Sequence, residues 1–233
     1  MKRAVIIVMV LGGGLVGLWL YFFPSYSWHQ KMTVEVEVDG QLYSGSSVVA
    51  MTVTGNPNFR IVPAVRKLEM RGEAVVIDLP KNRYLFALLN YNAFLASKVF
   101  SDKMDGLLSQ TGEGWAKIIS ELQETRDVAP KDYPLLATFM DINDSTTVKN
   151  VDPSDLAATF GQGVTLKRIT LGITDEPVTE GRVEAVLPWL YDVESLIPRS
   201  QLAPLIRDQT PDQSIKLRYF MDWRTMQTAR ERN

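Results

Sequence analysis

A cluster of oxygen-bearing side chains in the last third of the chain has part of the spacing of a cation-binding loop. Asp141, Asn143 and Asp144 are followed by Asp152, which stands at position twelve if Asp141 is position one. Oxygen ligands at positions one, three and twelve resemble a calcium loop. However, Thr146 occupies the position that needs glycine, and no glutamate closes the loop. The pattern favours a polar turn with Asx hydrogen bonds, followed by Asp152 as a helix cap, and predicts no metal site.

Nucleophilic chemistry has few candidates in this sequence. His29 is the single histidine, so a Ser-His-Asp triad would have to form around it. Ser46 and Ser47 lack a G-x-S-x-G frame, because Val49 stands where the second glycine would be. A serine–lysine dyad stays open, since the lysine could come from anywhere in the chain. We therefore predict no catalytic residue, and a role without catalysis is favoured while an enzymatic one stays open.

Cofactor binding has equally little support. Gly161 and Gly163 follow a predicted helix and precede a predicted strand, whereas a dinucleotide fingerprint needs the reverse order. Leu166 also occupies the place of the third glycine. Glu35 and Glu37 share one face of a predicted strand, where exposure to solvent is the ordinary interpretation of paired carboxylates. The sequence predicts no cofactor.

The composition excludes several classes of function. The chain has no cysteine, so disulfides, thiolate metal sites and cysteine nucleophiles are absent. The formal net charge is −2, and an acidic chain without a basic stripe is a poor nucleic-acid binder. A hydrophobic content of 45% with 22% charged residues is typical of a folded domain.

An uncharged run near the N-terminus, residues 4–23, has the sequence AVIIVMVLGGGLVGLWLYFF. As a helix with a rise of about 1.5 Å per residue it would span roughly 30 Å, the thickness of a bilayer's hydrocarbon core. Lys2 and Arg3 precede the run, which favours a cytoplasmic N-terminus. Pro24 follows it and ends the predicted helix. We therefore expect a single-pass protein of the inner (plasma) membrane, whose C-terminal domain is periplasmic or extracellular.

Aromatic residues crowd the far end of this run, as at a membrane interface. They are Trp19, Tyr21, Phe22, Phe23, Tyr26 and Trp28. The competing interpretation is a cleaved signal peptide, with Ser25 and Ser27 as the small residues of the cleavage site, but the length of the run favours a retained anchor. Gly13 and Gly17 form a G-x-x-x-G motif that can bring two spanning helices together as a homodimer, although glycine is also common in helices that do not pair.

The first half of the chain after the apolar run has the patterns of antiparallel strands. Residues 33–38 alternate valine with polar residues, and Asp39-Gly40 is a favoured two-residue turn, which predicts a hairpin over residues 28–54. Gly45 within the return strand marks a bulge or a close approach of another backbone. Further strands are expected at residues 61–70, 74–79 and 84–89, separated by short turns.

The second half mixes the two periodicities. Helices are predicted at residues 92–108 and 114–126, and a short helix is predicted between a cap at Asp152 and Gly161. Strands are predicted at residues 135–140, 164–173, 182–187 and 214–221, with a bulge between Leu166 and Ile169 where the apolar parity shifts. These elements predict an α+β domain with a mainly antiparallel sheet over residues 28–222, after an anchor and aromatic belt at residues 1–27 and before a polar tail at residues 223–233.

The segments 151–161, 164–169 and 187–190, together with the hairpin segment 28–48, resemble uncharacterised single-span, membrane-anchored periplasmic proteins of bacteria. The resemblance implies an inner-membrane anchor with a periplasmic domain and assigns no residue roles. Trp189 lies in the last segment and Tyr191 follows it. We prefer to interpret these aromatic residues as part of the core and not as a patch that binds a partner.

Two main functions follow from these patterns, and a third option is that the span mediates dimerisation while the domain only holds spacing. The first is a membrane-tethered domain that binds a protein or an envelope component through a sheet face or an edge strand, with membrane lipid contacted by residues 4–23. The second is a tethered envelope hydrolase that uses carboxylates or a serine. Convergence of Asp141, Asp144 and Asp152 in a cleft would favour the hydrolase.

Overall fold

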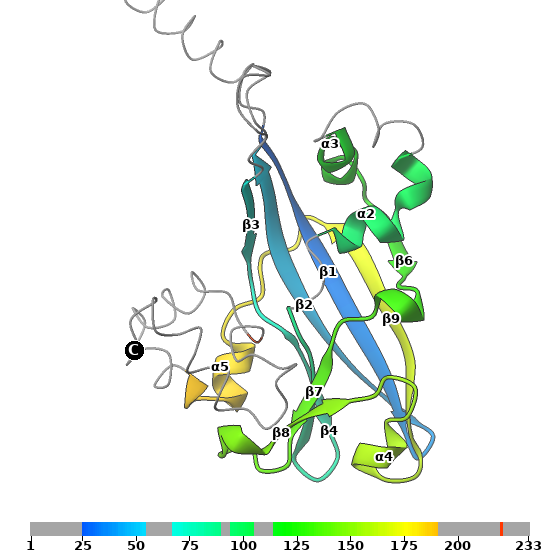
Figure 1. Cartoon of the computed structure of the whole chain (residues 1–233), viewed down its shortest axis with the longest axis vertical. Coiled ribbons are helices and arrows are strands. Elements are labelled where there is room, and N and C mark those ends of the chain that lie inside the picture. The colour runs from blue at the N-terminus through cyan, green and yellow to red at the C-terminus, as the bar shows by residue number, and fades with distance from the viewer. Residues whose placement is uncertain (1–24, 55–66, 90–93, 105–113, 191–219, 221–233) are drawn as a thin grey trace, which may run out of the picture.

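The computed structural model describes residues 25–54, 67–89, 94–104, 114–190 and 220, which form an α+β fold with antiparallel sheets and a few short helices (Figure 1). The strands are β1 (Ser25–Val38), β2 (Gln41–Thr54), β3 (Lys67–Arg71), β4 (Val75–Leu79), β5 (Arg83–Ala87), β6 (Thr125–Asp127), β7 (Leu136–Phe139), β8 (Val148–Val151) and β9 (Val164–Thr174). The α-helices are α2 (Leu95–Val99), α3 (Gly114–Ser120), α4 (Ala157–Phe160) and α5 (Arg182–Val186). Short 3-10 helices are η1 (Ser101–Met104), η2 (Pro130–Asp132) and η3 (Ser145–Thr147). The predicted fold class is confirmed for these residues.

The hairpin of β1 and β2 is the longest feature of the fold, and it confirms the predicted turn. Asp39 and Gly40 have φ angles of 50° and 84°, the left-handed values that a two-residue hairpin turn requires. Around this hairpin the five-stranded sheet has the order β3-β2-β1-β9-β6. The register between β1 and β9 shifts between Glu35 and Val36, so the predicted bulge is confirmed.

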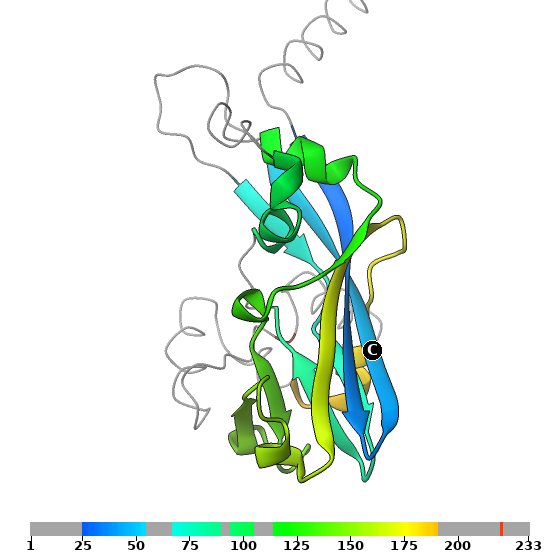
Figure 2. The same cartoon turned by 90° about the vertical axis from the view of Figure 1, so that its right-hand side faces the viewer.

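The five-stranded sheet has one apolar and one polar face. Every second residue of β1 from Trp28 to Val38 is buried, and the residues between them are half-buried. The buried face packs against α3 and the four-stranded sheet, which has the order β4-β5-β7-β8 (Figures 1 and 2). Alternation along β1 therefore separates the core from solvent, as a half-buried strand requires.

The four-stranded sheet is covered on both faces. Its second face belongs to a separate apolar cluster that includes Phe86, Phe139 and Phe220, with Val183 of α5 packed among them. The Phe86 ring centroid lies 5.2 Å from that of Phe220 and 5.8 Å from that of Phe139. The described part of the chain thus forms three layers: the long sheet, the short sheet, and the segment that carries α5.

The two sheets lie close together at Gly45. A Cβ atom built at this position would overlap the carbonyl oxygen of Val76 in β4. The β1–β2 register continues through Gly45 without a shift, so this glycine marks the close backbone approach and not a bulge in that pairing.

Several predicted helices are shorter than expected. The helix predicted at residues 92–108 consists, where described, of α2 and η1. The helix predicted at residues 114–126 ends at Ser120, and Thr125–Asp127 is strand β6, which pairs with β9. Tertiary pairing to a long strand overrides the weak helical preference of this short segment.

Other predictions about elements are wrong. Residues 182–187 were predicted to be a strand but contain helix α5, and β8 was not predicted at all. Asp152 does not cap α4, because its carboxylate accepts hydrogen bonds from Ser154. Leu156 holds the N-cap position without a side-chain hydrogen bond, and the carboxylate of Asp155 accepts from the N–H of Ala158 at 3.0 Å. Gly161 ends the helix with φ at 95°, as predicted.

The predicted anchor at residues 4–23, with Gly13 and Gly17, lies outside the described residues, as do the tail at residues 223–233 and all of the predicted strand at residues 214–221 except Phe220. Within the described ranges, no helix has the length and apolarity that a membrane crossing needs. The assignment of Tyr26 and Trp28 to an interfacial belt is wrong. Both belong to β1, where Trp28 is buried in the core and Tyr26 packs against it.

Candidate functional site

The structure separates the carboxylates of the calcium-like pattern. Asp141 follows β7 and Asp152 follows β8, and these antiparallel strands place them at opposite ends, about 10 Å or more apart. Asp141 accepts from the N–H of Asn143 at 3.0 Å, and Asp144 accepts from that of Thr146 at 2.9 Å. The polar turn predicted for this segment is therefore confirmed. Hydrogen bonds from Thr146 and Ser154 hold the pKa values of Asp144 and Asp152 below their usual range.

The nucleophile candidates are also held in structural contacts. Ser47 is buried, and its hydroxyl donates to the carbonyl oxygen of Glu73 at 2.6 Å. His29 lies in β1, where Nδ1 is 2.6 Å from the carbonyl oxygen of Glu176. Ser46 is exposed on the polar face of β2. The described residues do not bring these three side chains together with an acid–base partner.

Glu73 is a buried carboxylate that sequence reasoning missed. Its side chain is fully buried and accepts hydrogen bonds from the N–H groups of Arg182 at 2.8 Å and Val183 at 3.1 Å. Burial, with the nearby charge of Glu180 as a smaller cause, raises its pKa. Glu73 thus joins the start of β4 to α5. No local signal marks this role, because its partners lie more than a hundred residues away.

The polar face of the long sheet carries ion pairs between β1 and β9. Arg168 donates to both carboxylate oxygens of Glu35 at 2.8 Å, and Lys167 lies 3.1 Å from Glu37. The hydrogen bond from Arg168 and its charge lower the pKa of Glu35. The paired glutamates of the sequence pattern are therefore partners of basic residues on the neighbouring strand.

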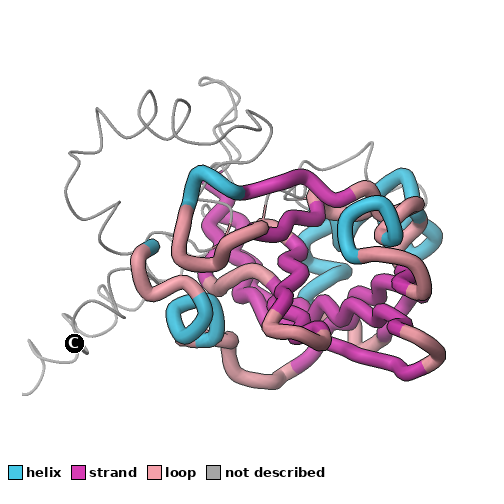
Figure 3. The backbone as a smooth tube through the Cα atoms, turned by 90° about the horizontal axis from the view of Figure 1, so that it is seen from below, coloured by secondary structure: helices cyan, strands magenta, loops and turns pink. Residues whose placement is uncertain are grey.

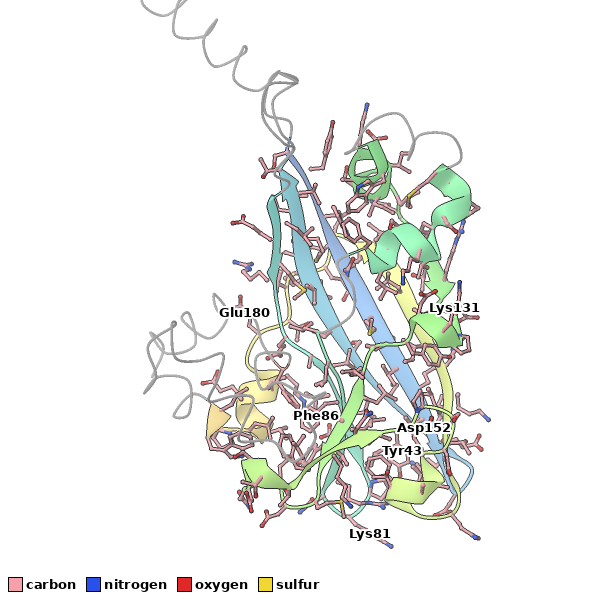
Figure 4. The ribbon with its side chains drawn as sticks, viewed as in Figure 1. Tyr43, Lys81, Phe86, Lys131, Asp152 and Glu180 are labelled. Carbon is pink, nitrogen blue, oxygen red and sulfur yellow. The ribbon has the colours of Figure 1, made fainter. Side chains whose placement is uncertain are left out.

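Three connections lie at the end of the molecule that carries the β1–β2 turn, which is the lower end in Figure 1 and is seen from below in Figure 3. The N–H of Asp39 donates to the carbonyl oxygen of Gly163 at 3.0 Å, which joins that turn to the α4–β9 connection. Arg83, at the start of β5, donates to the carbonyl oxygen of Phe160 in α4. Lys81 lies exposed in the β4–β5 turn at the same end, with a left-handed φ of 66° (Figure 4). Hydrogen bonds thus join the β1–β2 turn and the start of β5 to the segment that carries α4.

The part of β2 nearest to this end differs from its neighbours. We call residues 41–47 the distal segment of β2. Leu42 is 56% exposed, which makes it one of the most exposed large apolar side chains in the described residues, and Ser44 and Ser46 are exposed beside it. The other large apolar residues that are exposed lie elsewhere, Leu68 in β3, Phe94 directly before α2 and Met140 directly after β7. The distal segment is the candidate functional site, and it can offer backbone hydrogen bonds and one apolar side chain.

The position of Trp189 agrees with the interpretation that it packs in the core. It is half-buried, packs against the second apolar cluster, and donates from Nε1 to the carbonyl oxygen of Ile142 at 2.7 Å. Tyr191 lies outside the described residues.

In the part of the chain that the structure describes, His, Asp and Glu form no group of three that could hold a metal ion. Comparison of the chain with protein families, curated proteins and solved structures found no match.

Proposed function

We propose that the chain is a single-span protein of the inner membrane, and that its α+β domain binds a partner protein or an envelope component outside the cytoplasm. The apolar run at residues 4–23 and the basic pair Lys2 and Arg3 support the anchor and its orientation. No nucleic acid is expected as partner, because the chain is acidic.

The observation that carries the proposal is that no flexible linker separates the apolar run from the first strand of the fold. Ser25 opens β1, so only Pro24 separates it from Phe23. Two consecutive Cα spacings allow at most about 7.6 Å between Phe23 and Ser25. An embedded run would therefore hold the start of β1 at the membrane surface.

The length of the hairpin then determines which surface is presented. β1 has 14 residues, and at about 3.3 Å per residue it extends roughly 45 Å. Its turn, together with the distal segment of β2, lies at the end opposite to Ser25 (Figure 1). A rigid rod of this kind would present its distal surface to partners and keep that surface away from lipid.

The alternative function, a tethered hydrolase, needs carboxylates or a serine in one site. Asp141 and Asp152 lie at opposite ends of a strand pair, and Ser47 is buried against a backbone carbonyl. These placements favour binding as the proposal.

The absence of cysteine in the sequence provides a direct test of topology. Single variants Lys2→Cys and Asn82→Cys are expressed as the full chain and treated with a membrane-impermeant maleimide in intact spheroplasts. We expect labelling at position 82 without permeabilisation, labelling at position 2 only after it, and a full-length product that stays with the membrane in alkaline carbonate. A soluble shortened product, or protection of position 82, would contradict the proposal.

The homodimer through Gly13 and Gly17 is proposed as a secondary property of the same anchor. Replacement Gly13→Ile would prevent close approach of two spanning helices, so crosslinking in membranes should lose the dimer band. An unchanged dimer yield would show that the motif does not mediate pairing.

A further inference from the structure

The outer edge of β2 changes its neighbour along its length. β3 pairs with β2 only from Ala50 to Thr54, and after Arg71 the chain continues into β4, which packs against the distal segment at Gly45 without pairing with β2. At Val48 the neighbour is Thr179, whose N–H donates to the carbonyl oxygen of Val48 at 3.0 Å. Thr179 Oγ1 accepts from the N–H of Val48 at 2.9 Å. Both contacts lie on the side of β2 that faces away from β1.

These contacts define the direction of the backbone groups in the distal segment. Backbone groups of alternate residues point to the same side of a strand, and the β1–β2 register has no shift. Leu42, Ser44 and Ser46 therefore turn their N–H and carbonyl groups outward, as Val48 does. Among the described residues, none donates to or accepts from these groups on that side. All three residues are exposed.

The distal segment also lacks the protection that other edges carry. Charged residues and proline prevent natural edge strands from pairing with other chains. β3 has Lys67, Glu69 and Arg71, and β8 has Lys149. The distal segment, with the sequence QLYSGSS, contains neither a charge nor a proline. This edge therefore lacks the residues that prevent pairing with another strand.

We propose that the distal segment of β2 binds an extended peptide segment of another protein, which adds a strand to the five-stranded sheet. The proposal rests on the function proposed above and specifies the chemistry of the partner. Backbone hydrogen bonds from Leu42, Ser44 and Ser46 supply affinity. An apolar peptide side chain next to Leu42 and small ones next to the serines supply specificity.

A second copy of the chain does not fit this edge in one membrane. Two copies would pair symmetrically at this edge in the antiparallel sense, with β2 running in opposite directions. Copies anchored in the same bilayer both direct β2 from the distal end toward the membrane. The partner is therefore a different chain with an extended segment.

The test uses the full chain in phospholipid nanodiscs and a phage-displayed library of random heptapeptides. Enriched peptides are synthesised and titrated against the wild type, Ser44→Pro and Ser44→Ala. Proline removes the outward N–H without affecting the pairing to β1, whereas alanine changes only the side chain. We expect affinity to fall about tenfold or more with proline and to stay within about threefold with alanine.

Amide hydrogen exchange provides the second readout. Peptide binding should slow exchange at Ser44 and Ser46 and leave the amides of β1 unchanged. If Ser44→Pro does not fold, as judged by circular dichroism, Ser46→Pro replaces it. Equal affinity for the proline variant, no enriched peptide, or protection of these amides before peptide is added would each overturn the proposal. A failure of the topology experiment alone would contradict the tether and leave the peptide result standing.

Discussion

The two sheets of this domain are stabilised in different ways. The long sheet buries one face and presents charged and hydroxyl side chains on the other, with pairs such as Glu35 and Arg168 across β1 and β9. The short sheet is covered on both faces, and its second face depends on α5 and Phe220. The comparison teaches that the long sheet depends on one buried face, whereas the short sheet depends on cover over both of its faces.

The largest expected effect lies where the two sheets touch. Gly45→Val would place side-chain atoms on the carbonyl oxygen of Val76, so it should destabilise the fold by about 4 kcal/mol or more or prevent folding. Denaturant unfolding of the wild type and of Gly45→Val measures this difference. Gly40→Ala is the matched control, because nothing lies within 4 Å of its Cβ and only the left-handed φ costs about 1 kcal/mol. Equal effects of the two variants would show that the sheets do not pack closely at Gly45.

The second effect concerns the covered face of the short sheet. Phe86→Ala removes a fully buried ring that contacts Phe139 and Phe220, and should cost about 3–5 kcal/mol of unfolding free energy. Leu42→Ala, at an exposed position of the long sheet, should cost within about 0.5 kcal/mol. Thermal unfolding of both variants gives the comparison. Similar losses would contradict the distinction between the sheets.

Glu73 gives the third effect, which appears in the pH dependence. Its pKa is raised in the folded chain by burial, so the folded state binds the proton more tightly than the unfolded state does. Its contribution is full below the ordinary value of 4.5 and is lost as pH rises through the raised pKa. Glu73→Gln should match the wild type within about 1 kcal/mol at low pH and gain relative stability toward neutrality. A relative loss with rising pH would show that the amide donors of α5 outweigh burial.

Glu35 gives the smallest effect, with the opposite sign. Arg168 lowers its pKa, so the contribution of the pair is present above the ordinary value of 4.5 and is lost as pH falls through the lowered pKa. Glu35→Gln should therefore lose stability relative to the wild type as pH rises, by less than the change at Glu73, because salt and water screen an exposed pair. Parallel urea titrations at low and high salt measure this. An effect that salt does not reduce would contradict the solvent-exposed assignment.

The long sheet was the more predictable of the two from sequence. Alternating valines in β1, the Asp39-Gly40 turn and the parity shift in β9 each encode their structure locally, because the period of two and the turn geometry depend on neighbouring residues. The short segments β6 and β8 carry no such signal. A three-residue strand such as Thr125–Asp127 exists because β9 offers backbone partners. Residues 182–187 look like a strand by composition, yet Arg182–Val186 form α5 beside the buried carboxylate of Glu73.

The sequence by itself determined the apolar run, the lack of cysteine, the antiparallel hairpin and the polar turn at Asp141–Asp144, since each depends on composition or on contacts between residues close in the chain. Only the tertiary structure decided that Trp28 is buried, that Glu73 joins β4 to α5, and that the distal segment of β2 has an unpaired edge among the described residues. These features depend on which distant segments lie beside each other. Burial and unsatisfied backbone groups are properties of packed surfaces, so local periodicity does not encode them.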